Sequence, residues 1–181
     1  AVILHSDVEL RARMALLATD PVRAAAIDLP AGLLSAALAE LIGEHLIARE
    51  AERVQLADPS SADVSRELSR LLAGNGHPGP LEALMQRLGV ERSELEAIAR
   101  RRAIVAALMR ANLEGATSVS EQEIDERLRA SAFIRGEHES EARARVANTL
   151  AKEAMRRNIE RWVRVLRSRV TVRVLARYEE P

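Results

Sequence analysis

The sequence contains no cysteine and very few aromatic residues. Phe, Trp and Tyr occur once each among 181 residues. Without cysteine the chain can form no disulfide, no thiolate zinc site and no Cys nucleophile. Lys plus Arg and Asp plus Glu both total 27, so the formal charge is +0 and bulk charge attracts neither nucleic acid nor an anionic membrane. No unbroken apolar run approaches the length of a membrane span.

Helix-forming sequence is what the chain has in abundance. Hydrophobic residues, largely Ala and Leu, make up 48% of it, and charged residues another 30%. This composition is typical of a soluble helical protein, and apolar residues recur at helical spacing over most of the length. A chain of this size can bury a core of its own. We predict an all-α fold of about seven helices.

Local signals mark where several helices begin and end. Ser6-x-x-Glu9 and Ser120-x-x-Glu123 have the pattern of capping boxes, in which each side chain accepts a backbone N–H at the helix start. Gly89 follows a short apolar helix, and glycine is common just past a helix end. The Gly- and Pro-rich segment 74–80 predicts a loop.

The only β-like stretches stand at the two ends of the chain. They are Val2–Leu4 and the alternating, β-branched segment Val170–Leu175. Strands this short need a ladder partner for their backbone donors and acceptors. We therefore expect a small two-stranded sheet formed by the N- and C-terminal segments. Because the chain opens inside such a stretch, we also expect that a leader, and with it a first strand, was removed.

Patterns of catalysis and metal binding are lacking. The histidines His5, His45, His77 and His138 have neither helical pairing nor metal-ligand spacing, and no GxSxG, phosphate loop or nucleotide fingerprint is present. His45 falls on an apolar helix face, where a packed, hydrogen-bonded histidine is the ordinary interpretation. We predict no catalytic residue, no metal site and no cofactor.

Clusters of arginine leave an alternative open. Arg100–Arg102 and the series between Arg156 and Arg169 have the charge to contact a nucleic acid. Glutamates are interleaved with them and no aromatic platform accompanies them, so ion pairs on a solvated helix face are the commoner interpretation. A helical regulatory or nucleic-acid-binding protein remains the alternative function.

Six segments, taken in order, resemble a known family. They are Ser6–Val8 at the start of a helix, the leucine-rich helix 36–51, the helix that begins after 60–64, Leu88–Val90 before an Arg-rich helix, Val119–Ile124, and the final helix and β-like segment 161–175. Together they resemble the N-terminal chaperone domain of the SurA family. In that family a parvulin prolyl isomerase domain follows the fifth segment. Here the intervening stretch is far too short for a domain.

The resemblance implies a function and an organisation. It implies one chaperone module over 1–181, with an N-terminal helical part at 1–131 and a returning helix and strand at 139–181. It further implies a periplasmic holdase that binds unfolded outer-membrane or secreted proteins without catalysis, nucleic acid or membrane insertion. A prolyl isomerase is the least favoured reading, because the catalytic domain is missing. A homodimer formed by segment swapping is also open.

Candidate client-binding residues come from the chemistry of the apolar side chains. Met and Trp adapt to varied partners and are enriched at such surfaces. On this ground we predict that clients contact Met14, Leu17, Met85, Leu88, Met109 and Trp162.

Overall fold

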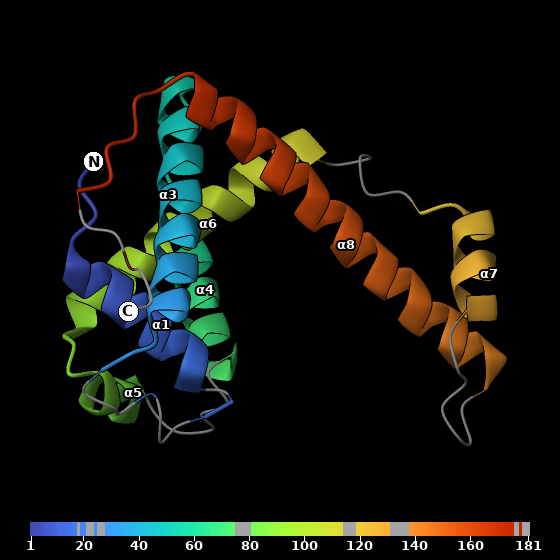
Figure 1. Ribbon diagram of the computed structural model, residues 1–181, viewed down its shortest axis with the longest axis horizontal. Coiled ribbons are helices and arrows are strands. Elements are labelled where there is room, and N and C mark those ends of the chain that lie inside the picture. The colour runs from blue at the N-terminus through green and yellow to red at the C-terminus, as the bar shows by residue number, and fades with distance from the viewer. Residues whose placement is uncertain are drawn as a thin grey trace. The chain divides into compact units, whose positions relative to one another are not determined.

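Seven helices account for nearly all the regular structure of the described chain. The computed structural model describes residues 1–17, 19–20, 24, 28–74, 81–113, 119–130, 138–175 and 178. Its helices are α1 (His5–Leu17), α3 (Ala31–Arg53), α4 (Ser61–Gly74), α5 (Leu81–Leu88), α6 (Arg92–Leu113), α7 (Glu121–Ala130) and α8 (Glu139–Ser168) (Figure 1). The helical prediction is confirmed for these residues. His77 and most of the predicted loop at 74–80 lie outside them.

The chain divides into two compact units. The first comprises Ala1–Leu108 together with Val170–Pro181, and the second comprises Met109–Arg169. The boundary therefore falls inside α6 and again just after α8. The predicted single module with parts at 1–131 and 139–181 stays a prediction, and its division differs from that of the two units.

The predicted sheet between the two ends is wrong. Neither residues 1–4 nor residues 171–175 form a strand, and the described residues contain no ladder. The two ends nevertheless reach the same core, because Ile3 and Tyr178 both pack against the cluster that joins α1 and α3. A ladder of three or four residue pairs adds little stability by itself. Side-chain burial thus holds these segments without pairing their backbones.

Helix ends follow the local signals with one shift. Ser120 and Glu123 form the predicted capping box, with Ser120 N–H donating to Glu123 Oε2 at 2.8 Å and Glu123 N–H to Ser120 Oγ at 3.2 Å. Gly89 ends α5 with φ of +64°, as predicted. At α1 the capping contact differs, since the Leu4 N–H donates to Asp7 Oδ2 at 2.7 Å. The helix therefore begins at His5, one residue before the predicted Ser6 cap.

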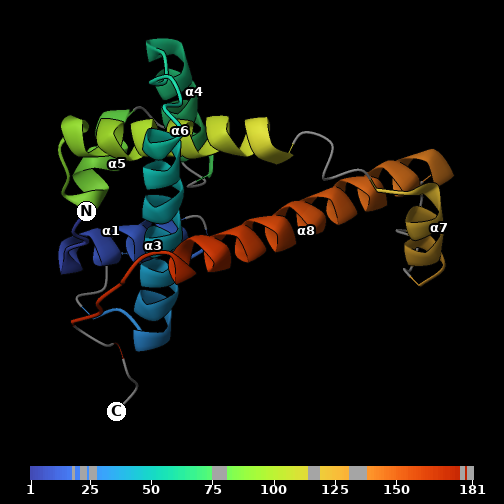
Figure 2. The same ribbon diagram turned by 90° about the horizontal axis from the view of Figure 1, so that it is seen from above.

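In the first unit α1 crosses α3 (Figures 1 and 2). Val8 and Ala12 of α1 pack against Leu34, Ala37 and Leu41 of α3. Each of these five side chains is buried. Two further clusters continue the core toward α4, α5 and α6, centred on Leu17 with Leu84 and on Met14 with Leu71.

One ion-pair network lies within this packing. Arg11 on α1 donates to Glu44 Oε2 on α3 at 2.6 Å, and their side chains are only 8% and 17% exposed. Arg102 on α6 reaches the other Glu44 oxygen at 3.9 Å. Burial, and then the neighbouring Arg11, lower the pKa of Arg102. Glu44 thus joins three helices through one carboxylate.

Helix α3 is unusually apolar. Among the described helices it alone is long and apolar enough, by length and composition, to cross a membrane, although no unbroken apolar run marks it in the sequence. The central helix of a folded core passes the same test. Eight of its residues are buried inside the first unit, which agrees with that second role.

The second unit contains a helical hairpin. Helix α7 packs against the first half of α8 (Figure 2) through Ile124, Leu128, Ala142 and Val146, all buried. At the edge of this contact Arg143 of α8 binds both Glu121 and Asp125 of α7, with Asp125 Oδ1 at 2.5 Å. Since this hairpin has a small core, the ion pairs that flank it help to fix its register.

Replacing Arg11 by Met should lower the free energy of unfolding by about 3 kcal/mol, because it leaves the Glu44 carboxylate largely buried without its closest partner. Urea unfolding followed by circular dichroism measures the change. Arg53→Met is the matched control, since Arg53 binds Glu50 on the surface at 2.7 Å and exposed pairs contribute little. An equal shift of the urea midpoint in both variants would contradict the structural role of Glu44.

Candidate functional site

A concavity of the first unit lies where the two ends of the chain meet α3. It has a volume of about 700 Å³, within the range of ligand-binding pockets. We call it the terminal groove. Residues 1–5 and Val8 line it, as do residues 170–175, Tyr178 and one face of α3 made by Leu38, Ile42, His45, Leu46, Ala48, Arg49 and Glu52.

Exposed apolar side chains gather at this groove. Six large hydrophobic residues of the described chain are exposed, and four of them line the terminal groove: Val2, Leu4, Val174 and Leu175, at 78%, 58%, 41% and 96% exposure. Isolated exposed hydrophobics are ordinary, but a contiguous group marks an interaction surface. The groove is therefore the strongest candidate for a binding site in the first unit.

The backbone of both terminal segments is also unpaired. No N–H or C=O of residues 1–3 or 170–175 has a hydrogen-bond partner among the described residues. Such groups behave like the edge of a sheet, which invites another extended chain. The groove therefore offers hydrogen bonds as well as apolar area.

A contact between side chains closes one end of the groove. The rings of His5 and Tyr178 stack with their centroids 5.6 Å apart, and the Tyr178 hydroxyl lies 2.7 Å from His5 Nδ1. His5 Nε2 lies 3.4 Å from Glu9. Burial, and then Glu9, raise the pKa of Tyr178, so the hydroxyl keeps its proton.

The charge of the groove comes mainly from arginine. Arg49 and Arg173 line it, and neither has an ion pair within the described residues. Glu52 is the one carboxylate among the described residues of the lining. Burial, and then Arg101, lower the pKa of His45, so this half-buried histidine is neutral at pH 7. The described lining is thus largely apolar and has one more arginine than carboxylate.

The predicted client-binding residues lie elsewhere. Met14 and Leu17 are 4% and 7% exposed and belong to the core. Met85 and Leu88 are half-buried and pack against the cluster that contains Leu17. The structure thus brings these four residues together as packing between helices. Their role in client binding stays a prediction, and only Met85 and Leu88 retain exposed area for it.

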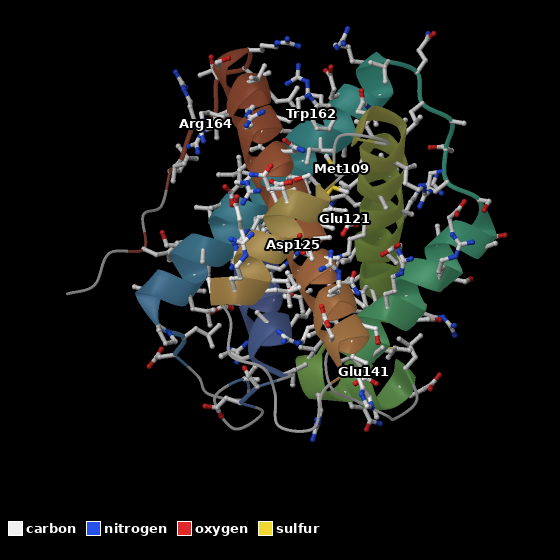
Figure 3. The ribbon with its side chains drawn as sticks, turned by 90° about the vertical axis from the view of Figure 1, so that its right-hand side faces the viewer. Met109, Glu121, Asp125, Glu141, Trp162 and Arg164 are labelled. Atoms are coloured by element: carbon white, nitrogen blue, oxygen red, sulfur yellow. The ribbon has the colours of Figure 1, made fainter. Side chains whose placement is uncertain are left out.

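The other two predicted residues belong to the second unit. Met109, near the end of α6, is 7% exposed, and Trp162 on α8 is half-buried (Figure 3). A shallow hollow lies along α8 at Ala151, Met155 and Ile159, flanked by charged residues. It is formed by one helix, so it offers a partner one apolar stripe and no opposing wall.

Several of the arginines that would bind a nucleic acid in the alternative function already have acidic partners. Arg100 binds Asp58 at 2.9 Å, and Arg102 lies 3.9 Å from Glu44. On α8, Arg156 pairs with Glu160 and Arg157 with Glu153 at i,i+4 spacing, as the interleaved charges predicted. These pairs reduce the positive field that a phosphate backbone would meet.

The sequence analysis singled out the two terminal segments that line the groove, but as strands of a sheet. The alternating, β-branched pattern of Val170–Leu175 was assigned to a ladder with the first residues. The same pattern also describes a segment whose apolar side chains rest on a core while its backbone stays open. The tyrosine three residues beyond the segment was a usable signal, because an apolar ring there can anchor the chain.

Removing residues 170–181 should lower the melting temperature by about 5 °C. The deletion uncovers Ile3 and the apolar face of α3 that Val172 and Tyr178 help to cover. Differential scanning calorimetry measures the change, with Leu175→Ser as the control because that side chain is 96% exposed. If the deletion variant and the control have the same melting temperature, the terminal segment is not part of the folded unit.

Comparison with known proteins does not indicate a function for this chain. No protein family, no curated protein and no solved structure matches this chain. The resemblance to the SurA family therefore stays a prediction from short sequence motifs. What the protein does has to be argued from the chemistry of the terminal groove.

Proposed function

We propose that the protein is a periplasmic holdase-type chaperone that binds unfolded outer-membrane or secreted polypeptides in the terminal groove, without catalysis. The observation that carries the proposal is the concentration of exposed apolar side chains and unpaired backbone around one cavity of about 700 Å³. An unfolded chain is the ligand that needs both, because it exposes apolar side chains and backbone hydrogen-bonding groups together.

The free energy that the groove can contribute is sufficient for weak, reversible binding of an unfolded chain. Burying one large apolar side chain contributes about 1.5–3 kcal/mol. A segment that places two or three such side chains in the groove gains enough to bind at micromolar concentration after the cost of ordering it. Segments destined for a β-barrel fit this description, since their side chains alternate between apolar and polar.

The nucleic-acid alternative has less support. The formal charge is +0, and the arginines of α6 and α8 are partly neutralised by the ion pairs described above. Among the described residues, Trp162 is the only aromatic side chain on α6 or α8, and it is half-buried. The groove, in contrast, combines apolar side chains with only a few charges.

Val174→Asp should weaken binding of an unfolded β-barrel client about tenfold, because it places a charge among the apolar side chains of the groove. Val54→Asp is the matched control: Val54 is 46% exposed against 41% for Val174, lies in the same unit and does not line the groove. Light scattering of an aggregating barrel protein and fluorescence anisotropy with a labelled peptide give the two readouts. Equal effects of the two variants would refute the proposed site.

The dependence of affinity on salt concentration, measured in the same anisotropy assay, distinguishes the chaperone from the nucleic-acid-binding protein. Affinity for a neutral, aromatic-rich peptide should change less than about threefold between 50 and 200 mM salt, because apolar burial depends little on ionic strength. Binding through arginine to a phosphate backbone would fall on the order of a hundredfold over this range.

The protein should not accelerate prolyl isomerisation. The reaction needs a preformed pocket that holds the proline ring, and the terminal groove has open apolar walls with exposed rims. A proline-limited refolding assay at micromolar protein tests this, with a known isomerase as the positive control. Acceleration well above the uncatalysed rate would overturn the non-catalytic assignment.

A further inference from the structure

We infer that the terminal groove holds its client as an added β-strand along residues 170–175 and prefers strands that carry an acidic residue. This inference rests on the proposed function and specifies how the groove binds and which segments it selects. It is carried by two observations, the open backbone of the segment and the unpaired arginines beside it.

The backbone of the segment is set up for strand addition. Residues 171–175 have no regular secondary structure, follow α8 after Arg169 and Val170, and have no hydrogen-bond partner for their backbone among the described residues. Val170 and Val172 are half-buried, whereas Thr171 and Arg173 are exposed. Over these four residues the alternation is the side-chain pattern of a strand with one face on a core, and Val174 beyond them is 41% exposed. An extended peptide laid beside it gains main-chain hydrogen bonds and places every second side chain in the cavity.

The charge of the groove limits which strand fits. Among the described residues, Arg49 and Arg173 have no acidic partner, and Glu52 is the only carboxylate that lines the groove. A client carboxylate near either guanidinium completes a charge-assisted hydrogen bond. A client lysine there meets charge of the same sign. The groove therefore discriminates by charge among clients of equal hydrophobicity.

Charge also argues against a second copy as the occupant. The segment 170–175 contains one arginine, Arg173, and no acidic residue. Pairing this segment with itself in another molecule would bring like charges together, which destabilises cross-strand pairs. An acidic client strand removes that repulsion, so the client is the occupant that the groove favours.

Four synthetic peptides and the unmodified protein test the added strand. All share an alternating Val/Phe core. The first has Glu flanks and the second has Lys flanks. The third and fourth repeat the Glu peptide with N-methyl groups along one edge or along the other. Methylation of the edge that pairs should weaken binding about tenfold or more, since each lost main-chain hydrogen bond adds to the cost. Methylation of the other edge should change affinity less than twofold.

A charge reversal tests the selection. The Glu peptide should bind about fivefold more tightly than the Lys peptide, and Arg173→Glu should reverse this order. Arg87→Glu is the matched control, because Arg87 is exposed, lies in the same unit and does not line the groove. The control should keep the order of the native protein. Thermal melting confirms that each variant is folded.

Each remaining outcome has a definite meaning. If both methylated peptides bind like the unmodified one, the added strand is wrong while the chaperone proposal stands. If the Lys peptide binds as tightly as the Glu peptide, the selection by charge is wrong. If no peptide binds, the groove is not the client site and the proposed function fails with the inference. A dimer in sedimentation that peptide dissociates would show that a second copy occupies the groove.

Discussion

The arrangement of the first unit depends on one carboxylate. Glu44 stands on the buried side of α3 and is held by Arg11 of α1 at 2.6 Å, with Arg102 of α6 at 3.9 Å. A charge removed from water without a partner costs several kcal/mol. Apolar contacts alone would tolerate some sliding of one helix along another, since they have no direction. The carboxylate therefore favours the one register of α1 and α6 that brings both arginines to it.

This register decides where the groove forms. Residues 1–4 continue directly into α1, so fixing α1 on α3 places Ile3 against the core cluster and Leu4 at the rim. At the other end, Tyr178 packs on the same cluster and stacks on His5. Two segments without regular secondary structure are thus held at their side chains near one face of α3. Because neither backbone is paired, the space beside them stays open to a ligand.

The predictions that held concern interactions between close neighbours in sequence. The capping box at Ser120 and the helix end at Gly89 depend on residues three or four apart, so their pattern is legible without the fold. The sheet was wrong because it depends on a contact across the whole chain. For that contact the sequence shows only that two segments favour an extended backbone. Whether such segments pair or rest separately on a core is decided by what anchors them, here Ile3 and Tyr178.

Two residues show what their type and spacing can indicate. Methionine is typical of adaptable surfaces, yet Met14 is buried between α1, α4 and α6, where a flexible side chain is equally useful, and its role in client binding stays a prediction. Glu44 lies within an apolar helix, where Leu41 and Ile47 stand three residues before and after it and are both buried. Helical periodicity places Glu44 on that same face. A charged residue on the buried face of an apolar helix therefore indicates a buried ion pair.

The terminal groove has to expose apolar surface without joining copies of the protein to each other. Exposed edges and apolar patches promote such association, and charged side chains on the edge are a common protection against it. Arg173 sits within the open segment and Arg49 beside it on α3. The like charge of Arg173 in two copies opposes their pairing. Under the function proposed above, one feature of the sequence, arginine set into a β-branched segment, both keeps the groove free and selects the acidic client that enters it.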